Sequence, residues 1–192
     1  MKVLAINGSA RKNGNTDILI NRIFEKMQAA GIETEKILLA ANGGIESCKA
    51  CFACAGRGNC VHQKDDFRAI FEKMKEADGI ILGSPVYSAN ISSNMQAFLE
   101  RAAVVCDVNP GLLTHKIGAS LVAARRGGAL NAIDAMDHFF LNHEMFVVGS
   151  TYWNIAYGPM IGDVLKDSEA LKTMDDLADN MIWLLQKTTD KK

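Results

Sequence analysis

Short hydrophobic runs alternate with helix-like patterns along the whole chain. The runs are short enough for buried strands and too short for helices, at 3–6, 32–39, 79–82, 117–123 and 145–148. Hydrophobic residues recur at helical spacing in the segments that follow them, at 16–30, 67–76, 92–105, 128–142 and 168–187. These five strand–helix units predict an α/β fold, in which helices cover both faces of a parallel sheet. No repeat or linker interrupts the pattern, which predicts one domain over residues 1–192.

Polar loops follow the first, third and fourth predicted strands, at 7–16, 83–90 and 124–128. Ligands of such sheets bind beyond the carboxyl ends of the strands, so these loops are candidates for one binding site. The first loop is rich in hydroxyl and amide groups, and the helix after it offers free N–H groups to an anion. The spacing of Gly8 and Gly14 matches neither a Walker A loop nor a dinucleotide-binding motif. The loop therefore suits a terminal phosphate, with an ordinary turn and helix cap as the alternative.

The other two loops suit a flat ring. Pro85 makes its loop rigid, so we expect the backbone amides of Val86 and Tyr87 to face a ring on which Tyr87 could also stack. The pair Gly127-Gly128 lets the backbone approach a planar ligand where a Cβ atom would collide. We expect all three loops to wrap the same ligand.

The chain resembles a known family at these loops. The run Ile80-Ile-Leu-Gly-Ser-Pro-Val-Tyr87, preceded by Gly8-Ser9 and Gly14-Asn15-Thr16, is similar to the NADPH-dependent FMN reductase branch of the flavodoxin-like fold. The resemblance implies a three-layer αβα sandwich with five parallel strands in the order 2-1-3-4-5, non-covalently bound FMN, and a homodimer or homotetramer. By position, it implies that the phosphate is held by Ser9, Arg11, Asn13, Asn15 and Thr16. The isoalloxazine would be lined by Pro85, Val86, Tyr87 and Asn90, with its other edge closed by Arg126, Gly127 and Gly128.

Charge and hydropathy exclude several classes of partner. The chain has 21 basic and 22 acidic residues and a net charge of −1, without a basic patch, so neither nucleic acid nor an anionic membrane surface is expected. No hydrophobic run approaches the roughly 18 residues of a membrane span. The chain opens with a strand-like run and no export signal, so we expect a cytoplasmic protein with reduced thiols.

Four cysteines lie together in a loop inserted at 45–63. Cys48, Cys51, Cys54 and Cys60 have the spacing C-x2-C-x2-C-x5-C, and the glycines between the last two let the chain turn. Four thiolates are the ligand set of a [4Fe–4S] cluster, and bacterial ferredoxins begin their cysteine run with the same C-x2-C-x2-C spacing. A zinc site, a redox-active C-x-x-C pair and cysteines without a metal are the alternatives. On this fold the motif resembles that of the iron–sulfur flavoproteins, which implies a cluster beside FMN.

These features lead to the hypothesis of an FMN-dependent electron-transfer oxidoreductase. The cluster would take electrons from a ferredoxin-like donor, FMN would pass them on, and backbone amides of Val86, Tyr87 and Gly127 would tune the flavin. The alternative is an NAD(P)H-dependent FMN or quinone reductase without a cluster, in which Arg57 or Arg126 meets the nicotinamide nucleotide. A flavodoxin-like electron carrier is a third interpretation, which the near-neutral charge disfavours. A second subunit would protect the exposed cysteine loop, in agreement with the implied homo-oligomer.

Overall fold

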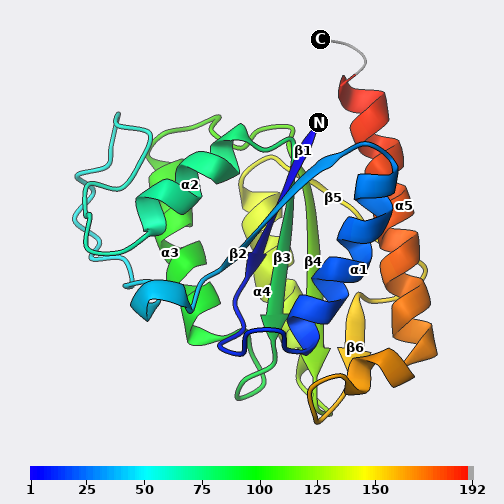
Figure 1. Cartoon of the computed structure of the whole chain (residues 1–192). Helices are drawn as coiled ribbons and strands as arrows, with labels where there is room; N and C mark the ends of the chain where they lie inside the picture. Colours follow the sequence, from blue (N-terminus) through cyan, green and yellow to red (C-terminus); the bar gives the residue numbers. More distant parts are fainter. Residues whose placement is uncertain (190–192) are drawn as a thin grey trace.

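A parallel sheet forms the centre of the computed structural model, which describes residues 1–189 (Figure 1). Its strands are β1 (Lys2–Asn7), β2 (Glu33–Leu38), β3 (Gly79–Pro85), β4 (Ile117–Ala124), β5 (Phe146–Val147) and β6 (Ile155–Tyr157). They pair in the order β2-β1-β3-β4-β5, and β6 also pairs with β4. The predicted order 2-1-3-4-5 is therefore confirmed.

Two short strands share the fifth position of the sheet. β5 pairs with the start of β4, with Phe146 opposite Ile117, whereas β6 pairs with its end, with Tyr157 opposite Ala124. The hydrophobic run at 145–148 correctly predicted the first of these strands, but the second was missed. This division matters for function because β6 carries the chain to the carboxyl edge of the sheet.

The helices form two layers, one on each face of the sheet. They are α1 (Asn15–Ala29), α2 (Phe67–Glu76), α3 (Ser93–Asp107), α4 (Ala129–Asn142) and α5 (Ser168–Thr189), with short 3₁₀ turns η1 (Ala41–Gly43) and η2 (Asp163–Lys166). One hydrophobic cluster joins the sheet to α1 and α5, and the other joins it to α2, α3 and α4. The expected flavodoxin-like three-layer arrangement is confirmed.

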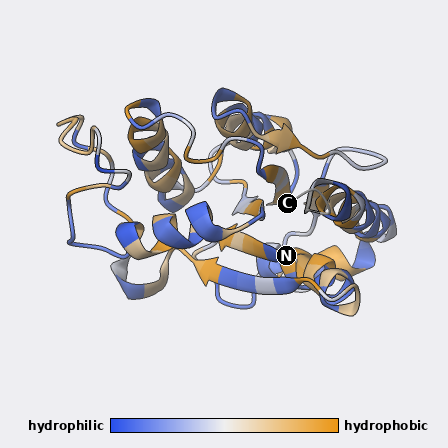
Figure 2. Ribbon diagram, turned by 90° about the horizontal axis from the view of Figure 1, so that it is seen from above, coloured by the Kyte–Doolittle hydropathy of each residue, from blue (hydrophilic) through white to orange (hydrophobic). Residues whose placement is uncertain are grey.

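Successive side chains of a strand point to opposite faces of the sheet and so contribute to both hydrophobic clusters. In β1, Val3 and Ala5 belong to the cluster under α1 and α5, whereas Leu4 and Ile6 belong to the cluster on the other face. All four side chains are fully buried, as expected for an inner strand of a parallel sheet. Figure 2 shows the contrast with β2, which is hydrophilic for most of its length and lies at the edge of the sheet.

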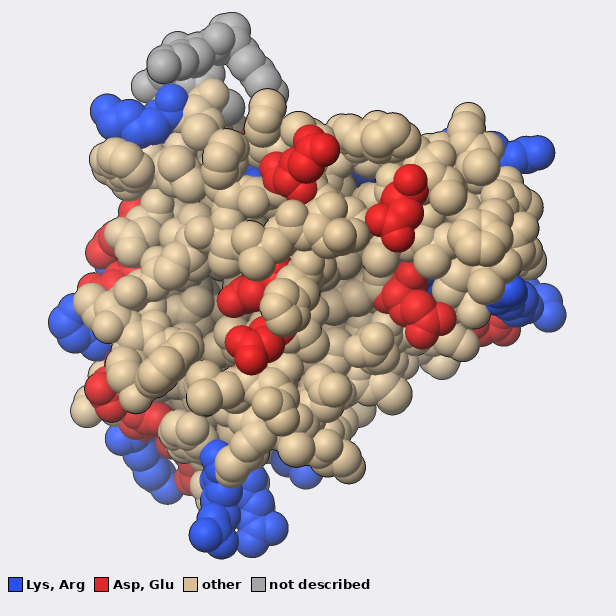
Figure 3. Space-filling model, turned by 180° about the vertical axis from the view of Figure 1, so that it is seen from behind, with Lys and Arg blue, Asp and Glu red and all other residues tan. Residues whose placement is uncertain are grey.

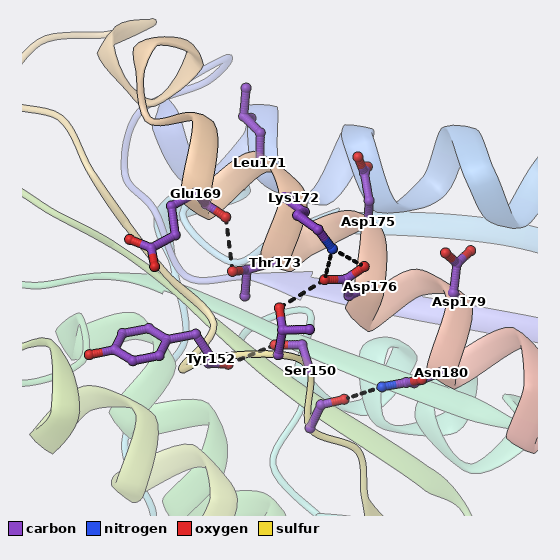
Figure 4. Close-up of polar contacts among 12 residues, drawn as sticks. Ser150, Tyr152, Glu169, Leu171, Lys172, Thr173, Asp175, Asp176, Asp179 and Asn180 are labelled. Atoms are coloured by element: carbon purple, nitrogen blue, oxygen red, sulfur yellow. Dashed lines mark hydrogen bonds and ion pairs between the residues drawn. The ribbon is translucent and has the colours of Figure 1, made fainter.

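The segment between β5 and β6 is fastened to α5 (Figure 4). The Asn180 side chain donates a hydrogen bond to the Gly149 carbonyl at 2.9 Å, and the Thr151 hydroxyl donates to Asp176 at 2.8 Å. Asp176 is itself paired with Lys172 at 2.6 Å. These contacts fix the path of the chain into β6 and hence the position of the residues that follow β6.

The cysteine loop lies outside the layered body. Residues 44–66 contain no helix or strand and connect η1 to α2. In Figure 1 this cyan segment projects beside α2 and α3, away from the carboxyl ends of the strands. Within residues 1–189, no helix has the length and hydrophobicity needed to cross a bilayer.

Candidate functional site

A cavity of about 260 Å³ opens at the carboxyl ends of the strands. The loops after β1, β3, β4 and β6 meet there, as expected for a ligand site in this class of sheet. Its lining residues are Ser9, Arg11, Asn15, Thr16, Pro85, Val86, Tyr87, Ala123, Ala124, Arg125, Gly158 and Pro159. Seven of these were predicted site residues, whereas the residues from β4, Arg125 and the pair after β6 were not.

The N-terminus of α1 faces this cavity with uncapped backbone N–H groups. Gly14 is the N-cap, so no side chain caps the helix. The first helical hydrogen bond runs from the Ile18 N–H to the Gly14 carbonyl at 3.0 Å, which leaves the N–H groups of the first turn without helical partners. Free N–H groups and the positive end of the helix dipole favour an anion such as a phosphate.

Thr16 is buried in this turn with an unused hydroxyl. The residue is 1% exposed, and its Oγ1 atom has no hydrogen-bond partner. An unsatisfied buried hydroxyl is costly, and a phosphate oxygen in the neighbouring cavity would satisfy it. Ser9 is also buried, and its Oγ accepts a hydrogen bond from the Arg11 N–H at 3.1 Å, which fixes the conformation of this loop. The residues present therefore fit a phosphate group.

Asn15 and Asn13 differ from the roles expected for their side chains. The Asn15 amide donates to the carbonyls of Gly158 and Met160 at 3.0 and 2.9 Å, and its oxygen accepts from the Gly162 N–H. Its side chain therefore fastens the segment after β6 and leaves only the backbone N–H for a ligand. Asn13 is exposed with φ of 56° and is not among the residues that line the cavity.

The loop after β3 is a tight hairpin turn, and this corrects one expectation. The Val86 N–H donates to the Ala123 carbonyl at 3.0 Å, and the Tyr87 N–H donates to the Asn90 carbonyl at 2.9 Å. Both amides that were expected to face a ring are thus already used within the protein. The Tyr87 side chain remains 42% exposed at the cavity, where it can stack on a ligand.

The loop after β4 also differs in detail from the expectation. Arg125 lines the cavity, whereas Arg126 does not. Gly128 has φ of 85°, and a Cβ atom there would come within 2.6 Å of the Ala89 Cα atom. The close approach of the hairpin turn therefore requires a glycine at this position. A Cβ atom on Gly127 would meet nothing within 4 Å, so the space beside it is open, although Gly127 is not among the residues that line the cavity.

All four loop cysteines line a second, smaller cavity, against α3. Cys48, Cys51, Cys54 and Cys60 share it with Arg101 and His62 among others. Within residues 1–189, no group of three or more His, Cys, Asp or Glu side chains is arranged to hold a metal ion. The cavity measures about 20 Å³, so the loop must widen to admit a cluster. Cys51 lies on its exposed outer side, where movement disturbs little packing. The four thiols that line this cavity match the number and type of ligands of a [4Fe–4S] cluster, which could enter only once the loop has widened.

The backbone of the cysteine loop has an unusual conformation. Ala50 and Phe52, which flank Cys51, have φ of 47° and 52°. Residues other than glycine rarely adopt such backbone angles, and each residue that does so costs on the order of 1–3 kcal/mol. Contacts from α3 and the residues after it hold the loop: Glu100 accepts from the Cys48 N–H at 3.1 Å, and Asn109 donates to the Cys54 carbonyl at 3.0 Å.

Arg101 is the main anchor that the sequence did not reveal. Its side chain is 4% exposed and pairs with Asp65, 5% exposed, at 2.5 Å. The same guanidinium donates to the Cys60 sulfur at 3.4 Å. Close by, burial raises the pKa of the Cys54 thiol, and the neighbouring Cys60 raises it further. Asp65 also accepts a hydrogen bond from the Phe67 N–H at 3.2 Å, at the start of α2.

The fold and the cavity at its carboxyl edge define a flavodoxin-like α/β protein. Among solved structures, the chain is similar to RosB with a bound flavin intermediate, with a TM-score of 0.80 and 19% identity over 100% of this chain and 81% of that one. It is also similar to a WrbA-like flavodoxin from Agrobacterium tumefaciens, with a TM-score of 0.69 and 14% identity, covering 97% and 98% of the two chains. At these identities the likeness concerns the fold alone.

Sequence comparison identifies the family. Residues 1–159 match the family model of NADPH-dependent FMN reductase, so the chain belongs to this family and is a flavin-dependent oxidoreductase. An iron-sulfur flavoprotein of Methanocaldococcus jannaschii is 37% identical, covering 92% of this chain and 93% of that protein. An iron-sulfur flavoprotein of Methanosarcina thermophila is 34% identical over the full length of both.

Proposed function

We propose that this protein transfers electrons between FMN in the carboxyl-edge cavity and a [4Fe–4S] cluster held by the cysteine loop. The observation that carries the proposal is that Cys48, Cys51, Cys54 and Cys60 all line one cavity. Two relatives that match this chain over nearly their whole length are named iron-sulfur flavoproteins, which supports the proposal. A cluster exchanges single electrons and FMN one or two, so the pair couples one-electron donors to two-electron acceptors.

The residues of the carboxyl-edge cavity would bind and orient FMN. The first turn of α1 and the Thr16 hydroxyl would donate hydrogen bonds to the phosphate. The Tyr87 side chain would stack on the isoalloxazine, and Gly127 would leave room for its edge. Arg125 takes the place in this proposal that the sequence assigned to Arg126.

The test is anaerobic purification followed by iron, sulfide and flavin assays on one sample. We expect about four irons, four sulfides and one FMN per chain. The Cys54→Ser variant should lose iron and keep FMN. Its control is Cys106→Ser, because Cys106 is buried in the core and does not line the cysteine cavity, so iron should remain. Wild-type protein that binds FMN but no iron, even after anaerobic reconstitution, would refute the cluster.

A second candidate function is an NAD(P)H-dependent FMN or quinone reductase without a cluster. The description of the matching family as NADPH-dependent favours it, as does the small volume of the cysteine cavity, about 20 Å³. In that enzyme FMN would take a hydride directly from the nicotinamide nucleotide. Rapid NAD(P)H oxidation by iron-free protein would select this candidate, whereas reduction by a ferredoxin-like donor alone would select the first.

We also infer that the protein acts as a homodimer or homotetramer. The face seen from behind in Figure 3 carries Lys and Arg only near its margins, whereas Asp and Glu also lie across its middle. A groove of about 560 Å³ between α3 and α4 includes a single formally charged residue, Glu100, and the exposed side chain of Leu141. A groove lined by so few charged groups supports burial against a second copy. A monomer in sedimentation at micromolar concentration would contradict the inference.

A further inference from the structure

The pair of Arg101 and Asp65 is the most deeply buried ion pair that the structure describes in residues 1–189. The side chains are 4% and 5% exposed, and Nη1 lies 2.5 Å from Oδ2. Taking two charges out of water is expensive, and a hydrophobic pair of similar volume often serves stability as well or better. An ion pair at this buried position therefore indicates a role beyond packing.

The contacts of Arg101 fix the direction of its two terminal nitrogens. Nη1 donates to Asp65 and also to the Glu46 carbonyl at 3.2 Å. The guanidinium carbon lies 4.3 Å from the centre of the Phe67 ring, which sets the plane of the group. Nη2 is directed at the cysteine loop, where it donates to the Cys60 sulfur at 3.4 Å and to the His62 carbonyl at 3.5 Å.

Cys60 is distinguished from the other three cysteines by this contact. The Cys48 sulfur accepts from the Ala50 N–H at 3.4 Å, and the Cys51 sulfur lies 3.5 Å from Nε2 of His62. Within residues 1–189, Arg101 is the only permanently charged donor within hydrogen-bonding distance of any of these sulfurs. A positive charge thus lies on one side of the cysteine cavity, backed by a buried carboxylate.

We propose that Arg101 is a positioning residue that raises the reduction potential of the cluster, through its hydrogen bond to the Cys60 sulfur. The inference rests on the proposed function. Reduction adds one electron and therefore one negative charge, which a positive N–H donor at a ligand sulfur favours. Asp65 acts in the opposite direction, because its negative charge partly cancels that of Arg101. The two residues should therefore shift the potential with opposite signs.

The test is a redox titration of the anaerobically reconstituted protein with dithionite, monitored by the EPR signal of the reduced cluster. Asp65→Asn keeps an acceptor for the backbone and should raise the potential. The double variant Arg101→Gln/Asp65→Asn removes both charges and replaces the guanidinium near the sulfur with a shorter, neutral amide, so it should lower the potential. We expect each shift to reach about tenfold in the reduction equilibrium, which is about 59 mV for one electron.

A matched control removes an ion-paired arginine elsewhere. Arg22 on α1 pairs with Asp175 on α5 at 2.6 Å, on the opposite face of the sheet, so Arg22→Gln should leave the potential unchanged. Should the double variant bind no iron, Arg101→Lys is measured instead. It keeps the charge but not the planar fork, and we expect a smaller downward shift.

The outcomes separate this inference from the proposed function. Variants that hold four irons at the wild-type potential would refute the role of Arg101 and leave the cluster in place. The wild-type potential in Arg101→Lys, combined with iron loss in the double variant, would make Arg101 purely structural and also refute it. Wild-type protein that takes up no iron would overturn both proposals.

Discussion

Replacement of Thr16 by Val should change FMN binding and the stability of the FMN-free protein in opposite directions. Valine keeps the shape of threonine but replaces the hydroxyl with a methyl group. In the FMN-free protein the buried Oγ1 atom has no partner, a situation that costs about 1–3 kcal/mol. Removal of the hydroxyl should recover part of this cost. For a domain of this size, each kcal/mol raises Tm by roughly 2–4 °C.

FMN binding should weaken because the phosphate loses a donor. A hydrogen bond to a charged group contributes about 1.5–3 kcal/mol, so the Kd of Thr16→Val should rise by about 10- to 150-fold. Quenching of flavin fluorescence during titration of the FMN-free protein measures this Kd, and urea unfolding without FMN measures stability. The two measurements use the same protein preparation and report on different states.

Thr173→Val is the matched control. Thr173 is also buried, at 2% exposed, but its Oγ1 atom donates to the Glu169 carbonyl at 2.9 Å in α5 (Figure 4). Its replacement should destabilise the protein by about 0.5–1.5 kcal/mol and leave the Kd for FMN unchanged. If Thr16→Val destabilised the FMN-free protein as the control does, or bound FMN with the wild-type Kd, the assignment of Thr16 to the phosphate would be wrong.

Three further predictions concern stability and reactivity. Gly128→Ala should lower the free energy of unfolding by more than about 1 kcal/mol, because Gly128 has φ of 85° and a Cβ atom there would collide with the Ala89 backbone. Gly127→Ala, the control, should change the free energy of unfolding by less than about 0.5 kcal/mol, and urea unfolding measures both values. Burial raises the pKa of Cys106 to about 12, so this thiol should resist iodoacetamide at pH 8 in native protein and react only after unfolding, as mass spectrometry of the alkylated peptides would show. A hydrogen bond from Lys73 lowers the pKa of Glu35 below its unfolded value, so Glu35 stabilises the fold above about pH 4 and this contribution is lost as the pH falls. Glu35→Gln should therefore be less stable than wild type by up to about 1 kcal/mol at pH 7 and equally stable near pH 2, and an equal deficit at both values would contradict the argument.

The alternation of short runs with helical patterns predicted the α/β class and the first five strands, whereas the strand order came from the resemblance to the FMN reductase family. β6 was missed for a physical reason: Ile155–Tyr157 has three residues, too few to show any period, and it follows the exposed aromatic residues Tyr152 and Trp153. The loss of β6 also hid Gly158 and Pro159, which line the cavity.

The candidate sites were predictable as loops but not as contacts. The loop after β1 and the cysteine spacing indicated where ligands bind, since both are local in the chain. The partners of Asn15 and Arg101 are distant in the sequence. Asn15 donates hydrogen bonds to Gly158 and Met160, which lie 143 and 145 positions later, and Arg101 pairs with Asp65, 36 positions earlier. An arginine in a helical pattern normally indicates the solvent-exposed face of the helix. Arg101 is buried because the folded cysteine loop brings the Asp65 carboxylate to it.

One helix connects the two candidate sites and sets their separation. At the N-cap of α3, the Ser92 hydroxyl donates to the Gly8 carbonyl at 2.6 Å, beside the phosphate loop. Further along the same helix, Arg101 contacts the Cys60 sulfur. With a rise of 1.5 Å per residue, these two points are about 13 Å apart along the axis. Electrostatic interactions between solvent-exposed groups are largely screened over that distance. Substitution of Arg101 should therefore alter the cysteine site without altering the affinity for FMN. The same rigid helix holds the cysteine loop off the FMN cavity within one chain, so a second copy that brings its own loop closer would offer the shorter path for electrons.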